Sequence, residues 1–336
     1  MVGGGPAGGA AATVLAAGGA GVVVVERSCY DGFRVGETLP PDVRLPLERL
    51  GAWDRFEAGG HLPSPGIISA WGSPEPYAND FILNPYGCGW RVDRNRFDAM
   101  LAAGAEEAGA VVLSGSPVEA CRRVAGGWEV TVAGSVLTAG HVVNATGRSS
   151  TFGRSLGGRR VVYDRLVALV GFASSAPADR RALIEATAEG WWYSAPLPDG
   201  RLVLAFQTDA GPGLRARWPE FLAAARVTAA RAAGAVAAGE VRVVPAGTSR
   251  AEPVAGDGWL AVGDAAAAHD PPAGLGIHWA LESGIAAAEA VLAGSAGVEA
   301  YATDAARRFD RYLATRVDYY RAEDRWPDAP FWRRRR

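Results

Sequence analysis

The sequence contains no lysine, and all 34 residues of the combined Lys and Arg count are arginines. These arginines are balanced by 36 acidic residues, so the formal net charge is −2. A chain this close to neutral lacks the basic surplus that is typical of nucleic-acid-binding proteins. Hydrophobic residues make up 49% of the 336 positions, which is enough for a large core divided between two domains.

Cysteine is also scarce. Cys29, Cys88 and Cys121 are widely spaced, and three cysteines without a C-x-x-C pair exclude a disulfide framework and a zinc site. No stretch is a convincing membrane span. Residues 9–25 are apolar like a signal peptide, but no basic segment precedes them and they continue directly into Glu26 and Arg27. The sequence therefore predicts a cytoplasmic protein without a metal.

A G-x-G-x-x-G motif opens the chain at residues 3–8. Its glycines allow a tight turn, a close approach to a pyrophosphate and close packing of the next helix, which we predict over residues 6–17. The helix N-terminus would offer N–H groups to the phosphates. The apolar run 22–25 predicts a buried parallel strand that ends at an acid suited to bind the adenosine ribose. The predicted dinucleotide contacts are Gly3, Gly5, Pro6, Ala7, Gly8, Glu26 and Arg27.

Only Met1 and Val2 precede this motif, where the fingerprint requires a strand. That strand would lie in the centre of the sheet, and a sheet without it would expose edges and lose core. We therefore expect that the true start lies upstream or that the chain is truncated.

A second glycine-bearing motif, residues 263–276, follows the apolar run 259–262. Asp264 at the end of this predicted strand can accept a hydrogen bond from a ribityl hydroxyl. The Pro- and Gly-rich loop then leads into a helix whose positive end would face flavin N1 and O2, where charge accumulates on reduction. The alternative is an ordinary strand–turn–helix connection with Asp264 as N-cap. The predicted flavin contacts are Gly263, Asp264, Pro271, Gly274, Leu275 and Gly276.

The pattern of elements predicts an α/β fold with an α+β second domain, in which both domains are discontinuous. We assign residues 1–60, 88–157 and 245–295 to a Rossmann-like FAD-binding domain, and 61–87 and 158–244 to an antiparallel-sheet substrate domain. Residues 296–336 would form a C-terminal helix and a basic tail whose final arginines, 333–336, are solvated. Within the substrate domain, helices are expected near 177–188 and 216–235.

The chain resembles the single-component flavin hydroxylase superfamily, which includes tryptophan halogenases and geranylgeranyl reductases. The FAD domain of that superfamily is of the glutathione-reductase/PHBH type. The resemblance rests on residues 3–8, 93–98, 145–147 and 263–276. G-E-T-L-P-P at 36–41, G-W-W-Y-S-A-P at 190–196 and R-W-P-D-A-P-F-W at 325–332 are similar to its halogenase-like branch. The nearest resemblance is to FAD-dependent maturases that modify tryptophan in quinone-cofactor precursors, and it covers nearly the whole chain.

The resemblance implies bound FAD, which after reduction would form a C4a-hydroperoxide and hydroxylate an aromatic substrate, such as a tryptophan of a peptide or protein. O2 would be the co-substrate, with electrons from NAD(P)H or a separate flavin reductase. It also implies further cofactor contacts at Arg94, Val118, Ala145, Thr146 and Gly147. Catalytic roles would fall on Glu37, His269 and Asp270, and the substrate pocket on Trp191, Trp192 and Tyr193. Structural alternatives remain open: a helix-start acid at Glu37, a structural donor at His269 and an aromatic core at 191–193.

Several departures from the resemblance bear on the chemistry. Flavin halogenases use a lysine to carry the halogenating species, and this chain has none. Their W-x-W-x-I-P motif corresponds to residues 191–196, with Tyr and Ala in place of Trp and Ile, and their halide-binding pair corresponds to Ala273-Gly274. The departures favour oxygen insertion. The alternatives are a flavin-dependent halogenase, a geranylgeranyl-reductase-like flavin reductase and a non-catalytic flavin-binding protein.

Overall fold

The computed structural model describes residues 1–149, 152–153, 155–175, 177–271 and 274–336. Its nucleotide-binding half is built on parallel pairs: β1 (Val23–Val25) with β7 (Val111–Leu113), and β11 (Val142–Asn144) with β20 (Trp259–Ala261). Val2 forms parallel bridges to both Val25 and Asn144, and the Met1 amine donates to Val23 O at 2.8 Å. The first two residues therefore take the central position of the sheet.

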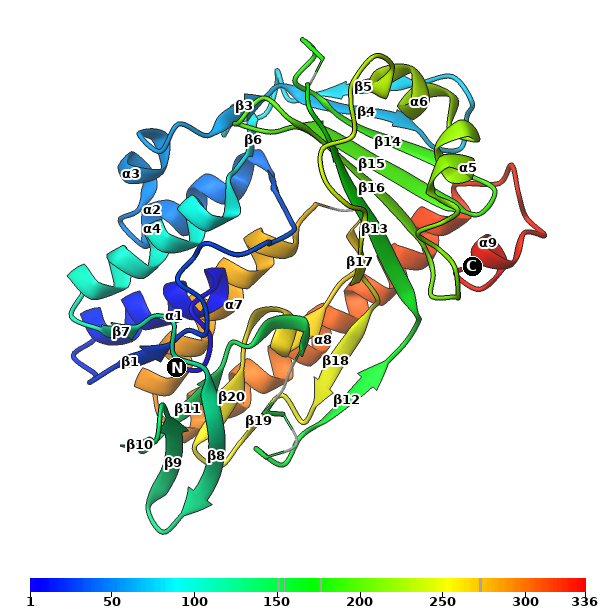
Figure 1. The fold of residues 1–336 in the computed structure, drawn as a ribbon. Coiled ribbons are helices and arrows are strands. Elements are labelled where there is room, and N and C mark those ends of the chain that lie inside the picture. Colours follow the sequence, from blue (N-terminus) through cyan, green and yellow to red (C-terminus); the bar gives the residue numbers. More distant parts are fainter. Residues whose placement is uncertain (150–151, 154, 176, 272–273) are drawn as a thin grey trace.

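Helix α1 (Pro6–Ala17) covers this half together with α7 (Gly276–Leu292) and α4 (Arg94–Glu107), and α8 (Ser295–Arg321) packs outside α7 (Figure 1). The small side chains of α1 permit close packing. A Cβ on Gly284 of α7 would lie 2.3 Å from Ala7 O, so only glycine fits there. Asp93 caps α4 by accepting hydrogen bonds from the backbone N–H of Asn95 and Arg96.

The second half is a seven-stranded sheet in the order β17-β13-β16-β15-β14-β4-β5. Its pairs are antiparallel except β14 with β4. Two short helices, α5 (Trp218–Ala223) and α6 (Arg226–Ala232), lie against its outer side (Figure 1). The strands are β4 (Gly66–Ala70), β5 (Tyr77–Asp80), β13 (Leu166–Ala173), β14 (Ala182–Thr187), β15 (Gly190–Pro196), β16 (Leu202–Asp209) and β17 (Arg242–Pro245).

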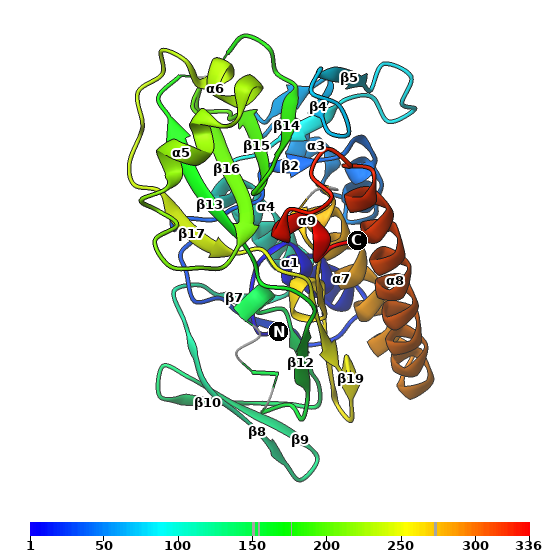
Figure 2. The same cartoon turned by 90° about the vertical axis from the view of Figure 1, so that its right-hand side faces the viewer.

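The remaining, smaller elements lie around the two halves, and the β8–β9–β10 sheet projects from the bottom of the molecule (Figure 2). The smaller elements are β2 (Thr38–Leu39), α2 (Arg44–Arg49), α3 (Trp53–Glu57), β3 (Leu62–Ser64), β6 (Gly89–Arg91), β8 (Val118–Val124), β9 (Gly127–Val132), β10 (Ser135–Ala139), β12 (Arg159–Val162), β18 (Ser249–Glu252), β19 (Ala255–Gly256), β21 (Ala267–Ala268) and α9 (Pro330–Arg333).

No helix in the described part of the chain is both long and apolar enough to span a lipid bilayer.

Two helix predictions in the second half were wrong. Residues 182–187 form strand β14 because β15 and β4 pair with both of its edges, and this pairing overrides the helical propensity of Ala, Leu and Glu. The helix predicted over 216–235 is broken at Ala225, whose backbone is extended. The buried Glu185 carboxylate accepts hydrogen bonds from Val227 N at 3.0 Å and Thr228 N at 2.6 Å, and so starts a separate helix.

The prediction of a solvated arginine tail is right for Arg333 and Arg334, which are exposed, but wrong for Arg335. Arg335 is 2% exposed, and its guanidinium donates to Asp209 at 2.6 Å and to Phe331 O at 2.8 Å. Trp332 on the short helix α9 is fully buried and donates from Nε1 to Thr187 O at 2.9 Å. This packing brings the C-terminus back against the seven-stranded sheet, beside the end of α8 (Figure 2).

Candidate active site

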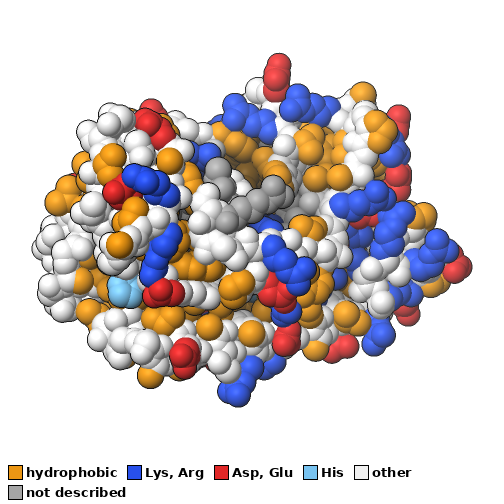
Figure 3. Space-filling view, turned by 90° about the horizontal axis from the view of Figure 1, so that it is seen from below, with side chains coloured by type: hydrophobic (Ala, Val, Ile, Leu, Met, Phe, Trp, Pro, Cys, Tyr) orange, Lys and Arg blue, Asp and Glu red, His pale blue; other side chains and the backbone are white. Residues whose placement is uncertain are grey.

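A cavity of about 910 Å³ lies between the nucleotide-binding half and the seven-stranded sheet, and residues of both halves line it. Seen from below, the protein surface is hollowed near its centre, with hydrophobic side chains inside the hollow (Figure 3). Of the predicted cofactor contacts, the following line the cavity: Gly3, Gly5, Pro6, Ala7, Glu26, Arg27, Arg94, Val118, Ala145, Thr146, Gly147, Asp264, Pro271, Gly274 and Gly276. The remaining three, Gly8, Gly263 and Leu275, are not among the described lining residues.

The glycine motif has the shape that a pyrophosphate requires. A Cβ on Gly8 would lie 2.0 Å from Gly3 O, and one on Gly3, whose φ is +102°, would lie 2.3 Å from Ala145 O. At Gly5 no atom lies within 4 Å of that position, so the backbone borders open space. Helix α1 starts directly after Gly5 with no side-chain cap, which leaves its first N–H groups available to an anion. These residues therefore fit the diphosphate of FAD.

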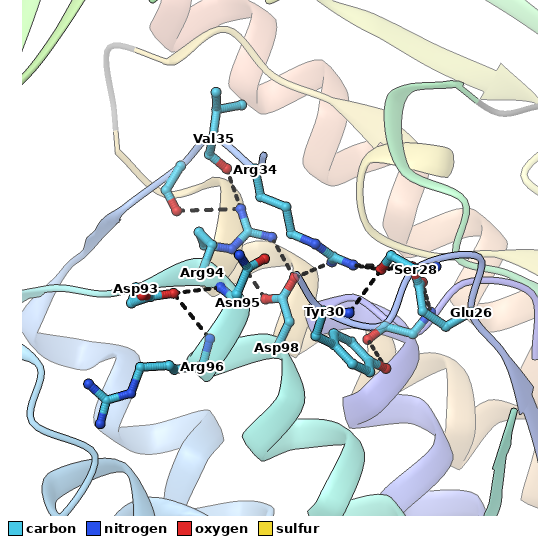
Figure 4. Close-up of polar contacts among 12 residues, drawn as sticks. Glu26, Ser28, Tyr30, Arg34, Val35, Asp93, Arg94, Asn95, Arg96 and Asp98 are labelled. Atoms are coloured by element: carbon cyan, nitrogen blue, oxygen red, sulfur yellow. Dashed lines mark hydrogen bonds and ion pairs between the residues drawn. The ribbon is translucent and has the colours of Figure 1, made fainter. Parts of the chain in front are cut away.

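A polar network supports the adenosine end of the cavity (Figure 4). Glu26 accepts hydrogen bonds from Gly4 N at 2.8 Å and from Ser28 N and Oγ at 3.0 and 2.6 Å. Burial acts to raise the pKa of the Glu26 carboxyl, but these bonds and the charge of Arg34 outweigh it and hold the pKa below its ordinary value. Glu26 is therefore a fixed carboxylate, as the prediction of a ribose acceptor requires.

Two arginines join this network to α4. Arg34 bridges Glu26 and Asp98 (Figure 4). Arg94 donates to both oxygens of Asp98, at 3.2 and 3.0 Å, and also contacts the carbonyls of Val35 and Gly36. Both arginines line the cavity. Arg94 was predicted, whereas Arg34 was missed because it belongs to no motif.

The loop predicted to contact the flavin, which follows β20 from residue 263 and is called the flavin loop below, is held by two more arginines that belong to no motif. Arg148 pairs with the Asp264 carboxylate at 3.2 Å and donates to Gly247 O at 2.6 Å and to His269 O. Arg160 donates to Asp264 O at 2.7 Å and to Ala265 O at 3.1 Å. Helix α7 then begins at Gly276 without a side-chain cap. Ala273, the first residue of the halide-pair position, lies outside the described residues.

His269 and Asp270 are part of this loop, and the Asp270 side chain is buried in a cluster of polar and aromatic groups. Asp270 is 4% exposed and accepts hydrogen bonds from Tyr312 Oη at 2.6 Å and from Arg316 Nε at 2.8 Å. The His269 ring packs against Trp279 and Tyr312, with ring centroids 4.1 and 4.4 Å apart. Burial lowers the pKa of His269 to about 3, with Arg148 acting in the same direction, so the imidazole is neutral near pH 7. The catalytic roles assigned to the two residues stay predictions.

The part of the cavity wall that the seven-stranded sheet and residues 37–38 form is polar at only a few points. Glu37 is buried, and burial raises the pKa of its carboxyl against the opposing charges of Arg94 and Arg91. Tyr193 extends from β15 into the cavity and hydrogen-bonds through its hydroxyl to Thr38 Oγ1. The rest of this wall is mainly small and apolar and comprises Ala168, Val170, Val203, Ala205, Gln207, Val244, Pro245 and Ala246.

The structure separates the three predicted substrate-pocket aromatics. Among the described residues that line the cavity, Tyr193 is present but Trp191 and Trp192 are not, which corrects the prediction for both tryptophans. Trp192 points to the other face of the sheet, because side chains alternate along a strand, and its Nε1 donates to Phe221 O at 3.3 Å. Trp191 shares the face of Tyr193 but is fully buried, with its ring against Trp71, and donates to Tyr320 Oη at 3.3 Å.

Comparison with known proteins agrees with this site. The FAD binding domain family matches residues 1–316. LodB of Marinomonas mediterranea, named as an FAD-dependent oxidoreductase, is 27% identical over 328 residues, covering 93% of this chain and 89% of LodB. A tryptophan 2-halogenase of Chondromyces crocatus is 26% identical over 314 residues, covering 87% of this chain and 60% of the halogenase.

Solved structures show the same fold. CmlS, a flavin-dependent halogenase, has a TM-score of 0.90 at 26% identity, over 100% of this chain and 66% of CmlS. QhpG, a peptidyl tryptophan dihydroxylase essential for tryptophylquinone cofactor biogenesis, has a TM-score of 0.81 at 25% identity, over 99% of this chain and 77% of QhpG. The predicted α/β fold class is thus confirmed, as are FAD as the cofactor and an enzymatic role. The chain belongs to the FAD binding domain family and is an FAD-dependent oxidoreductase.

Proposed function

We propose that this enzyme is a monooxygenase that hydroxylates an aromatic ring, and that its substrate is a tryptophan in a peptide or protein. The observation that carries the proposal is that one continuous cavity joins the dinucleotide cradle to a wall of small apolar side chains. An aromatic ring placed there would lie beside the loop that starts α7, which is the flavin end of the site. The name of QhpG, a peptidyl tryptophan dihydroxylase, supports the same substrate class.

When bound and reduced, FAD would supply the activation of O2 that hydroxylation requires. The protein itself would bind FAD, orient the substrate ring and shield that ring from water. Gly5 and the start of α1 would hold the diphosphate, Glu26 the ribose, and the N-terminal end of α7 the flavin ring. The apolar wall would keep water from the reacting ring. Electrons would come from NAD(P)H or from a separate flavin reductase.

Glu37 is the residue that we propose to act on the substrate. It is buried, it lines the cavity, and burial raises the pKa of its carboxyl above the ordinary value, which makes the carboxylate a stronger base. In this role it would accept the proton that the ring loses as oxygen adds. Glu37→Gln should lower turnover by roughly 10²-fold or more with FAD content unchanged. The matched control is Glu48→Gln, an exposed acid on α2, which should leave turnover unchanged.

Halogenation is the second candidate, and the similarity to CmlS over the whole chain favours it. Against it stands the absence of lysine, since the resembling halogenases rely on that side chain to deliver the halogen. Both candidates require the same cavity and the same cofactor, so they differ only in the atom that is transferred.

The deciding experiment uses the FAD-loaded protein, reduced without oxygen and then mixed with isotopically labelled O2 and a tryptophan-containing peptide. Mass spectrometry should show a peptide that has gained labelled oxygen, in equal yield with and without chloride or bromide. A halogen-bearing product that depends on the added halide would replace the proposal with the second candidate. A peptide left unmodified while reduced FAD is reoxidised would refute both for this substrate.

A further inference from the structure

We propose that a small cavity between α7, α8 and the flavin loop takes up O2 and leads it to the flavin end of the site. The inference rests on the proposed function, because it presumes a reduced FAD that reacts with O2. It goes beyond that function by giving O2 an entry that a bound substrate does not occupy.

The small cavity has a volume of about 60 Å³ and is lined by residues 263–269 of the flavin loop, 276–286 of α7 and 301–309 of α8. Three of its lining side chains, Glu282, Asp304 and Arg308, are 38, 61 and 44% exposed, so its outer end reaches solvent. Arg308 lies 2.6 Å from the Glu282 carboxylate and 3.9 Å from that of Asp304. The charged groups of this outer end are therefore paired with one another.

The inner end of the small cavity adjoins the large cavity of the active site. Asp264, His269, Gly276, Trp279 and Ala280 line both cavities. The rings of His269 and Trp279 pack with their centroids 4.1 Å apart. Gly276 begins α7, whose N-terminal end is proposed to hold the flavin ring. One layer of side chains thus separates the small cavity from the flavin end, and small side-chain motions would let a diatomic molecule pass.

The lining favours an apolar gas over water. Ala266, Ala305 and Phe309 contribute apolar surface, and the hydroxyls of Ser283 and Tyr301 already donate to backbone carbonyls at 3.0 and 2.7 Å. A buried water usually makes about three hydrogen bonds to groups that lack partners, whereas O2 requires none. The volume also exceeds the roughly 10–15 Å³ that a single water needs, so a diatomic molecule fits.

A separate entry matters because the large cavity has two occupants in the working enzyme. FAD would fill the dinucleotide cradle, and the substrate ring would cover the apolar wall. O2 that had to pass the substrate would require an opening there, and such an opening would also admit water to the reacting ring. Entry between α7 and α8 leaves that shield closed.

The first test needs neither FAD nor substrate and uses crystals of the FAD-free protein under xenon pressure. Xenon is an apolar gas that occupies apolar cavities, so wild type should bind a xenon atom in the small cavity. Ala305→Leu, which fills the small cavity from α8, should lose that atom. The matched control is Ala306→Leu, the same substitution at the next residue of α8, which is exposed and absent from the described lining of both cavities. This variant should keep the xenon atom.

The second test measures reoxidation of the reduced, FAD-loaded protein by O2 in a stopped-flow instrument, with and without the tryptophan peptide. Without a substrate, two electrons and two protons pass from the reduced FAD to O2 and give FAD and H2O2. With the peptide present, Ala305→Leu should slow reoxidation at least about twofold, because the closed route would have carried half or more of the O2. Ala306→Leu should reoxidise like wild type.

A small cavity of wild type that stays empty or holds water under xenon pressure overturns the inference and leaves the proposed function standing. Equal reoxidation rate constants for the two alanine variants, with and without the peptide, also overturn it. Ala286→Leu fills the same cavity from α7 and replaces Ala305→Leu if that variant does not fold. A peptide that gains no labelled oxygen refutes the proposed function, whereas the xenon result is independent of that outcome.

Discussion

Arg316→Met should destabilise the fold by removing the cation between two buried carboxylates. The Arg316 side chain is 9% exposed and reaches Asp270 at 2.8 Å and Asp164 at 2.9 Å. Breaking a buried ion pair from one side costs about 3–5 kcal/mol. The unfolding entropy of 336 residues is about 0.7 kcal/mol/K, so the melting temperature should fall by about 4–7 °C.

The assay is thermal unfolding monitored by circular dichroism, with FAD-loaded and FAD-free protein measured separately. Arg308→Met is the matched control, because Arg308 lies on the same helix but is 44% exposed in its pair with Glu282. It should lower the melting temperature by no more than about 1 °C. Asp270→Asn added to Arg316→Met removes one of the stranded carboxylates and should restore part of the loss. Equal melting temperatures for the two arginine variants would refute the role given to this cluster.

Three further predictions concern the cofactor and the cavity. Gly8→Val should prevent FAD binding, because even a Cβ at this position would lie 2.0 Å from Gly3 O. Gly5→Ala should fold normally and only weaken FAD binding, because no atom lies within 4 Å of the added Cβ. A flavin fluorescence titration measures FAD binding by both variants. The pKa of His269 is about 3 when folded and 6.5 ordinarily, so the unfolded chain binds the proton first and stability falls as pH drops through this interval. His269→Gln should lose less stability in acid-unfolding measurements, and an unchanged acid profile would contradict the neutral buried ring. Tyr193→Phe should keep its FAD and bind aromatic peptides less tightly by calorimetry, and unaltered binding would argue against a role for that hydroxyl.

The dinucleotide end of the site could be predicted because its structure depends on interactions between residues close together in the sequence. The boundaries of α1, residues 6–17, agree with those predicted from the sequence, since glycine spacing, a proline at the first turn and a run of alanines all act within a few residues. Glu26 follows the same rule, as an acid at the end of the next strand. The turn before α7 has a similarly local pattern of glycine and proline, which is why its cavity-lining residues were also predicted.

Predictions from helix propensity were wrong where contacts with segments distant in the sequence determine the secondary structure. Residues 182–187 read as helix until two strands pair with them, and α5 and α6 separate because Glu185 of the adjacent strand caps the second helix. The final arginines are polar, yet Arg335 is buried because Asp209 meets it there.

The cofactor and the α/β class could be predicted from the sequence alone, because they depend on motifs and on the order of helix and strand patterns. The side chains that line the cavity became known only from the folded chain. Trp192 and Tyr193 are neighbours in sequence but point to opposite faces of a strand, and Gln207 belongs to no motif. The arginines at 148, 160 and 316 hold the flavin loop from distant parts of the chain. Such long-range contacts arise from packing and leave no local pattern in the sequence.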